Sequence, residues 1–212
     1  VKPNFAEAHN NMGNALFESK ETDASLDSYK QAIRIKPDYA EAYNNLGIAL
    51  NSKGDIAEAI ESYNQAIKIK PDFIDAFYNM GISLVAIRAF ALAIECYNRV
   101  IAIDPNHVNA YFFKGNALAI LGKLDAVIQN YEMVLSINPN HQNARANKLH
   151  YQSLICDWKA LKKDQHFIAK LGTSTEAVGP FAMLMLEDAP ERHRLRADKF
   201  SKITFTQTPL PL

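Results

Sequence analysis

Asparagines at a fixed spacing are the side chains of this sequence whose type and register indicate a shared chemical task. Asn11, Asn45 and Asn79 lie 34 residues apart, and Asn147 falls on the same register two periods later. A carboxamide carries hydrogen-bond donors and an acceptor, so it can pair with a peptide bond whatever the neighbouring side chain is. The spacing therefore indicates a row of equivalent amide groups, each able to form such hydrogen bonds.

The other reactive side chains form no catalytic or metal-binding pattern. The six histidines are dispersed, and no pair has the spacing of metal ligands. Cys96 and Cys156 are far apart, which is typical of reduced thiols in a cytosolic protein. No glycine-rich phosphate loop follows a strand. We therefore expect no catalytic residue, no metal site and no cofactor.

The charge and hydropathy of the chain disfavour two classes of partner. Lys plus Arg total 23 and Asp plus Glu total 23, so no net positive charge favours nucleic acid. No apolar run approaches the roughly 18 residues of a membrane span, and no secretory signal is present. We expect a cytoplasmic protein that binds neither nucleic acid nor a membrane.

The asparagine register belongs to a period of 34 residues that runs through most of the chain. Prolines, glycines and tyrosines share it: Pro3, Pro37, Pro71, Pro105 and Pro139; Gly13, Gly47, Gly81 and Gly115; Tyr29, Tyr63, Tyr97 and Tyr131. A strict period of this length predicts stacked supersecondary units instead of one globular core.

Each unit reads as two helices, and the second unit shows the pattern most clearly. Its first helix is predicted from about Tyr39 to Ser52, with Asp38 as N-cap and Glu41 completing a capping box. Gly54 can take the left-handed conformation in the turn. A second helix is predicted from about Ile56 to Ile69. The equivalent N-cap places in the other units are held by Asn4, Asp72 and Asn106.

These features resemble the tetratricopeptide repeat, whose consensus has aromatic, Leu-Gly and alanine places; the departures concentrate in the fourth unit, at Lys114, Val127 and Val134. The aromatic place holds His9, Tyr43, Phe77 and Tyr111, and the Leu-Gly pair is Met12-Gly13, Leu46-Gly47, Met80-Gly81 and Lys114-Gly115. The resemblance implies an all-α, right-handed superhelical solenoid whose first helices line an inner groove. The predicted units are residues 6–39, 40–73, 74–107 and 108–141. Residues 1–5 read as the end of an earlier repeat, so we infer a piece of a longer protein.

Residues 142–203 are predicted to be a degenerate fifth repeat and a helical C-terminal cap. The expected elements are helices over 143–153 and 157–171, a short apolar helix over 180–186, a helix from about 188 to 201, and an extended tail over 204–212. Trp158, Leu161 and Ile168 fall on one helical face. We expect that face to pack near Tyr131 and Val134, because stacked repeats need a unit that covers their last apolar face.

A second resemblance concerns this C-terminal segment. The stretches Leu154-Ile155-Cys156-Asp157-Trp158 and Pro180 to Pro190 resemble the joint of bacterial SPINDLY-type proteins, relatives of O-linked N-acetylglucosamine transferase. In that family the array leads into two catalytic lobes, which are absent here, and its groove asparagines form a ladder along a bound peptide. The resemblance implies a substrate-recognition arm without enzymatic activity of its own. The alternatives are a free-standing adaptor and a generic helical cap.

Apolar residues also fall at places that the resemblance assigns to the inner groove. They are Ile48, Tyr78, Ile82, Val85 and Phe112, and Phe113 interrupts the asparagine register in the fourth unit. Such a patch can dock apolar side chains of a peptide or be covered by another copy of the chain. The predicted groove therefore combines amide and apolar groups.

Overall fold

The structure is a computed structural model that describes residues 5–173, 178 and 186–205, and every regular element in these ranges is a helix. The chain divides into two compact units, residues 1–110 and 111–212. Within the described ranges, no helix combines the length and the apolarity needed to cross a membrane.

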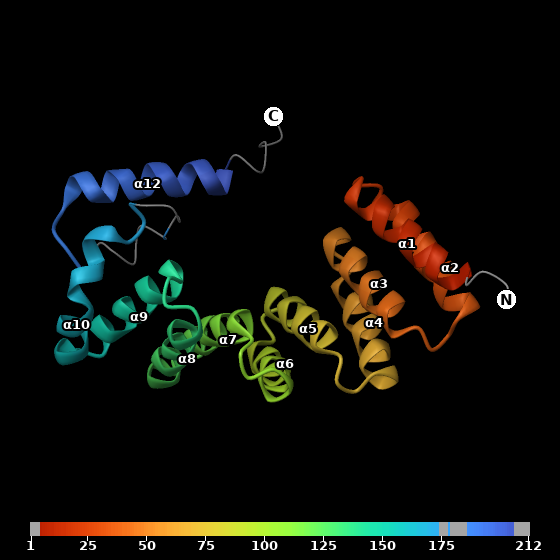
Figure 1. Cartoon of the computed structure of the whole chain (residues 1–212), viewed down its shortest axis with the longest axis horizontal. Coiled ribbons are helices and arrows are strands. Elements are labelled where there is room, and N and C mark those ends of the chain that lie inside the picture. The colour runs from red at the N-terminus through yellow and green to blue at the C-terminus, as the bar shows by residue number, and fades with distance from the viewer. Residues whose placement is uncertain (1–4, 174–177, 179–185, 206–212) are drawn as a thin grey trace. The chain divides into compact units, whose positions relative to one another are not determined.

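The first unit consists of consecutive helix pairs. Its helices are α1 (Phe5–Glu18), α2 (Thr22–Ile35), α3 (Ala40–Lys53), α4 (Ile56–Ile69), α5 (Ile74–Ala86) and α6 (Phe90–Ile103). Helix α1 packs on α2, α3 on α4, and α5 on α6, while α3 also packs on α2 and α5 on α4 (Figure 1). The all-α, paired-helix prediction is confirmed.

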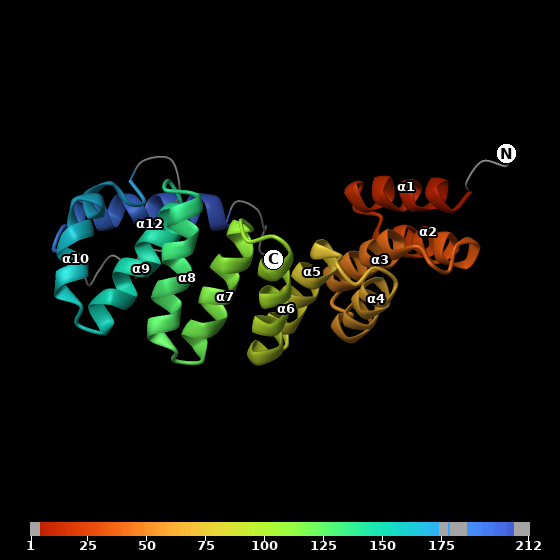
Figure 2. The ribbon, with the colours of Figure 1, turned by 60° about the horizontal axis from the view of Figure 1, so that its bottom comes forward.

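The second unit continues the pairs and ends in less regular elements. Helix α7 (Val108–Ile120) begins at the boundary and is followed by α8 (Leu124–Ile137), α9 (Gln142–Leu154), α10 (Trp158–Asp164), the 3-10 helix η1 (Gln165–Lys170) and α12 (Pro190–Phe205). Helices α8 and α9 lie side by side (Figure 2). The predicted helix over 180–186 lies outside the described residues except for Leu186.

A glycine against a tyrosine ring sets the distance within each helix pair. A Cβ added at Gly47 would lie 2.5 Å from Cε1 of Tyr63, and one at Gly13 would lie 2.5 Å from the same atom of Tyr29. Both rings are buried. The periodic glycines and tyrosines of the sequence are therefore partners, because only glycine leaves room for the ring on the facing helix.

The helix starts differ from the predicted caps. Helix α3 begins one residue later than expected, with Tyr39 at the N-cap and no side-chain cap bond, so the prediction for Asp38 is wrong. Histidines cap two other helices: Nδ1 of His107 accepts from the Ala110 amide at 3.1 Å, and Nδ1 of His141 accepts from the Ala144 amide at 3.2 Å. His107 takes the role that sequence reasoning gave to Asn106.

The predicted helix over 157–171 breaks in the middle. Asp157 caps its start as expected, with Oδ1 accepting from the Ala160 amide at 3.1 Å. The chain then tightens to a 3-10 helix, whose shorter turn rotates later side chains away from an α-helical face. Trp158, at the start of α10, is 61% exposed, whereas Ile168 in the 3-10 helix packs on Ala146 and Leu149 of α9. The expected shared packing on α8 is wrong.

Helix α12 is held to the end of η1 by a buried arginine. Arg196 is 0% exposed; its Nε donates to the Leu171 carbonyl at 2.7 Å and its Nη2 to the Ile168 carbonyl at 2.8 Å. Nη1 forms an ion pair with Glu187. The guanidinium thus satisfies the Leu171 carbonyl at the end of η1 and adds a second bond to the Ile168 carbonyl, which also accepts from the Leu171 amide. The helix continues to Phe205, two residues into the tail predicted as extended; residues 206–212 lie outside the described part.

Candidate functional site

Side-chain amides connect the first helices of successive repeats in the first unit. Nδ2 of Asn45 on α3 donates to Oδ1 of both Asn10 and Asn14 on α1, at 3.1 Å each. Nδ2 of Asn79 on α5 donates to Oδ1 of Asn44 on α3 at 3.0 Å. The predicted asparagines at 45 and 79 are therefore linked to their neighbours on the preceding repeat.

The network follows from the repeat register. Each donor binds the asparagine 35 residues earlier, which is one period plus one place. Sequence reasoning found the donors but missed the acceptors Asn10, Asn14 and Asn44. The signal for two of them was the Asn-Asn pair that recurs at residues 10–11 and 44–45. Asn11, on the outermost described helix, is exposed.

A small pocket lies beside this network. It has a volume of about 270 Å³ and is lined by Asn14, Phe17, Glu18, Tyr29, Asn45 and Ile48. The Tyr29 hydroxyl donates to Oδ1 of Asn14 at 2.9 Å. Burial, aided by Glu18, raises the pKa of Tyr29 to about 12, so this hydroxyl stays a neutral donor at physiological pH. The pocket thus joins amide groups to apolar walls.

The predicted site residues on α5 lie next to an aromatic cluster. The Tyr78 ring is 5.2 Å from the His107 ring and 6.3 Å from the Tyr97 ring, centroid to centroid. Burial raises the pKa of Tyr78, and a hydrogen bond with Asn109 opposes that shift. Tyr78, Asn79 and Ile82 are all half-buried. Helix α5 therefore offers partly accessible aromatic, amide and aliphatic groups.

The second unit holds the remaining predicted site residues. Asn147 Nδ2 donates to the Tyr131 hydroxyl at 3.3 Å, and that hydroxyl donates to Oδ1 of Asn116 at 2.7 Å. Burial raises the pKa of Tyr131 well above its usual range, despite the bond from Asn147. Phe112 and Phe113 contact edge to face with centroids 5.6 Å apart. The Phe112 ring also lies 4.9 Å from the His141 ring, which makes it part of the packing of this unit.

The described residues hold no constellation for metal chemistry. No group of three or more His, Cys, Asp and Glu side chains in them could bind a metal ion. What the described site offers is hydrogen-bonding amides and apolar contact surface.

Comparison with known proteins assigns the helix pairs to a family. A family profile described as "TPR repeat" matches residues 13–54 and 49–87, and one described as "Tetratricopeptide repeat" matches residues 78–141. A search of curated proteins finds no sequence that matches this chain.

Solved structures share the fold at low sequence identity. MamA 41-end from Desulfovibrio magneticus RS-1 is 20% identical with a TM-score of 0.73, over 84% of this chain and 100% of that one. YrrB, described as a TPR protein with an unusual peptide-binding site, is 22% identical with a TM-score of 0.70, over 87% and 92%. The first TPR of Spaghetti (RPAP3), bound to the HSP90 peptide SRMEEVD, is 21% identical with a TM-score of 0.56, over 57% and 97%.

Proposed function

We propose that this chain, which belongs to the tetratricopeptide repeat family, is a scaffold that binds an extended peptide segment of a partner protein along the first helices of its repeats. The observation that carries the proposal is the pocket beside Asn45, where amides and the apolar side chains of Phe17 and Ile48 meet. The descriptions of YrrB and of the RPAP3 domain, both similar in fold, name peptide binding. We also propose a cytoplasmic location, supported by two cysteines that form no disulfide.

The amide network leaves particular atoms for a peptide. Both Nδ2 hydrogens of Asn45 have acceptors within the protein. Among the described residues, Nδ2 of Asn14 and Oδ1 of Asn79 have no protein partner, so one can donate to a peptide carbonyl and the other accept from a peptide amide. Because neighbouring bonds already orient these amides, binding loses less conformational entropy.

A substitution with a matched control tests this proposal. Peptides selected from a phage-displayed library on the intact chain are titrated against Ile48→Lys and Ile35→Lys. Ile48 lines the pocket, whereas Ile35 is an exposed isoleucine near the end of α2. We expect Ile48→Lys to weaken binding about tenfold or more and Ile35→Lys to leave it unchanged. Equal affinities of parent and Ile48→Lys would overturn the proposal.

A narrower proposal is that the scaffold recognises substrates for an O-N-acetylglucosaminyltransferase-like enzyme. Its support is the sequence of residues 154–158 and 180–190, which resembles the joint to the catalytic lobes of that family. The competing candidate is a free-standing adaptor. The gene sequence downstream of the codon for Leu212 separates the two. Two Rossmann-like lobes encoded there support the enzyme arm, and a stop codon or an unrelated domain refutes it.

A further inference from the structure

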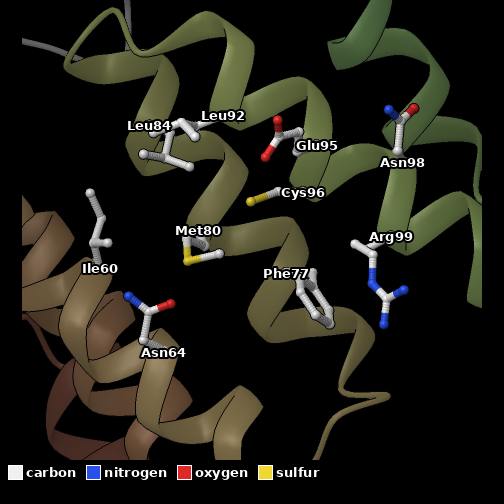
Figure 3. Close-up of a pocket in the computed structure, with 10 residues that line it drawn as sticks. All are labelled: Ile60, Asn64, Phe77, Met80, Leu84, Leu92, Glu95, Cys96, Asn98 and Arg99. Carbon is white, nitrogen blue, oxygen red and sulfur yellow. The ribbon is translucent and has the colours of Figure 1, made fainter.

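A second pocket lies away from the amide network, on helices α4, α5 and α6. Its volume is about 660 Å³, and it shares no lining residue with the pocket beside Asn45. Ile60 of α4, Phe77, Met80 and Leu84 of α5, and Leu92 and Cys96 of α6 form its apolar walls (Figure 3). Pockets of this size with mostly apolar walls and a few polar groups are typical of sites for small molecules.

The pocket lies at the junction between the second and third repeats, whose side chains differ from those of the preceding junction. One repeat earlier, the places of Ile60, Met80 and Leu84 are held by Leu26, Leu46 and Leu50, and all three leucines are buried. Ile60 and Met80 are instead half-buried. This junction therefore differs from the preceding one at two of the three places, whereas Leu84 is buried like Leu50.

The third repeat also changes the chemistry of the pocket wall. Leu92 stands where the first two repeats have Ala24 and Glu58, Cys96 where they have Ser28 and Ser62, and Arg99 where they have Gln31 and Gln65. Leu92 is 52% exposed, an apolar group at a place where a polar residue is tolerated. Burial raises the pKa of the Cys96 thiol to about 11, so the thiol is uncharged at neutral pH. The three changes make the wall more apolar and add one cation.

Arg99 is placed to attract an anion at one end of the pocket. Its Cζ lies 5.7 Å from the centroid of the Phe77 ring, and it makes no ion pair with the described residues. Glu95 lies on the other side of Cys96, near Leu92 (Figure 3). Glu95 repels an anionic ligand and Arg99, four residues later on the same helix, attracts it, so we place the ligand's charge beside Arg99 and the Phe77 ring.

We propose that this pocket binds an aliphatic carboxylate, with its hydrocarbon chain between Ile60, Met80 and Cys96 and its carboxylate on Arg99. The apolar walls of the pocket favour a ligand with a hydrocarbon chain, because burying each methylene group away from water is favourable. A guanidinium binds a carboxylate through charge-assisted, two-point hydrogen bonds, which glutamine cannot reproduce. This site is independent of the peptide-binding proposal.

NMR signals of the methionine methyl groups in the full chain test where the ligand binds. Met80 lines the pocket, whereas Met12 and Met133 are exposed elsewhere. Decanoate is titrated below its micelle concentration into protein labelled at the methionine methyl groups. Met80→Leu, which copies Leu46 of the preceding repeat, assigns the resonance. We expect saturable movement of the Met80 signal with the Met12 and Met133 signals unchanged. An unmoved Met80 signal, or equal movement of all three, would overturn the proposal.

Two further titrations test the chemistry of recognition. Arg99→Gln, which restores the residue of the first two repeats, should weaken decanoate about tenfold and leave decanol unchanged. In the parent, decanol should bind about tenfold more weakly than decanoate because it carries no charge. The carboxylate assignment would be contradicted if the parent bound decanoate and decanol equally well. It would also be contradicted if Arg99→Gln bound decanoate as tightly as the parent does.

Discussion

The carboxamides of Asn45 and Asn10 are joined by a hydrogen bond of 3.1 Å, from Nδ2 to Oδ1, across 35 residues of sequence. The bond connects the first helices of two successive repeats, and its counterpart joins Asn79 to Asn44 at 3.0 Å. One register of asparagines therefore has two roles in our account: it aligns neighbouring repeats, and it orients the amides that a peptide would meet.

Removing the central amide should lower the stability of the first unit. Asn45→Ala leaves Oδ1 of Asn10, which is buried, without the donor it has now, and removes a second bond to Asn14. We expect the free energy of unfolding to fall by about 1–3 kcal/mol. Asn11→Ala, at an exposed place of the same register, should change it by less than about 0.5 kcal/mol. Chemical denaturation measures both, and equal effects would mean that the network adds no stability.

The close approach of Gly47 to Tyr63 should make this glycine intolerant of any side chain. Gly47→Ala places a methyl group 2.5 Å from the ring, whereas the same change at Gly115 meets Tyr131 at 3.0 Å. Overpacking typically costs about 1–3 kcal/mol, offset in part by the better helix propensity of alanine. We expect Gly47→Ala to lower the melting temperature more than Gly115→Ala. A larger fall in melting temperature for Gly115→Ala than for Gly47→Ala would show that the Tyr63 ring can move aside without loss of stability.

The Arg196–Glu187 pair should make the stability of the second unit depend on pH. Burial raises the pKa of Glu187, but hydrogen bonds from Arg192 and Arg196 outweigh it and hold the pKa below the ordinary value of 4.5. A carboxyl with a lowered folded-state pKa stabilises the protein above 4.5, and that contribution is lost as the pH falls through the folded-state value.

We therefore expect the parent to lose stability in acid faster than Glu187→Gln does, as measured by thermal unfolding across this pH range. Arg196→Met should lower the free energy of unfolding by about 1–3 kcal/mol at neutral pH, because the Leu171 and Ile168 carbonyls lose their buried donor while Glu187 keeps its bonds from Arg192. Parallel pH profiles of parent and Glu187→Gln would show that the ion pair contributes nothing.

The aromatic pair in the fourth repeat provides a test of self-association. We propose that Phe112 and Phe113 belong to an apolar surface that a second copy of the chain can cover, supported by their half-buried side chains. Phe113→Asn, which restores the residue of the other repeats, should lower the mass measured by light scattering at high concentration. Ile155→Asn, on an exposed isoleucine outside this pair, is the control. If the mass of Phe113→Asn equalled that of the parent, Phe113 would contribute to packing within the chain and not to self-association.

The repeat period was enough to predict the fold but not the details of the site. The proline, glycine and tyrosine registers mark equivalent positions in successive units, so the helix pairs and the second helix of the second unit, Ile56–Ile69, could be predicted. That each glycine meets a tyrosine ring is seen only in the structure. The acceptors of the amide network depend on how far one repeat rotates against the next, which a period does not specify. The break at Asp164 and the bonds of Arg196 lie in a segment without a period, where the sequence offers no internal comparison.

Contacts between a selected peptide and isotope-labelled side chains test the central claim most directly. Isotope-filtered nuclear Overhauser spectra of the complex report which protein protons lie next to the peptide. Our account predicts cross-peaks from the Ile48 methyl groups and the Asn14 side-chain amide, which line the pocket beside Asn45. Cross-peaks confined to Ile35 or to Ile60 of the α4–α6 pocket would contradict it.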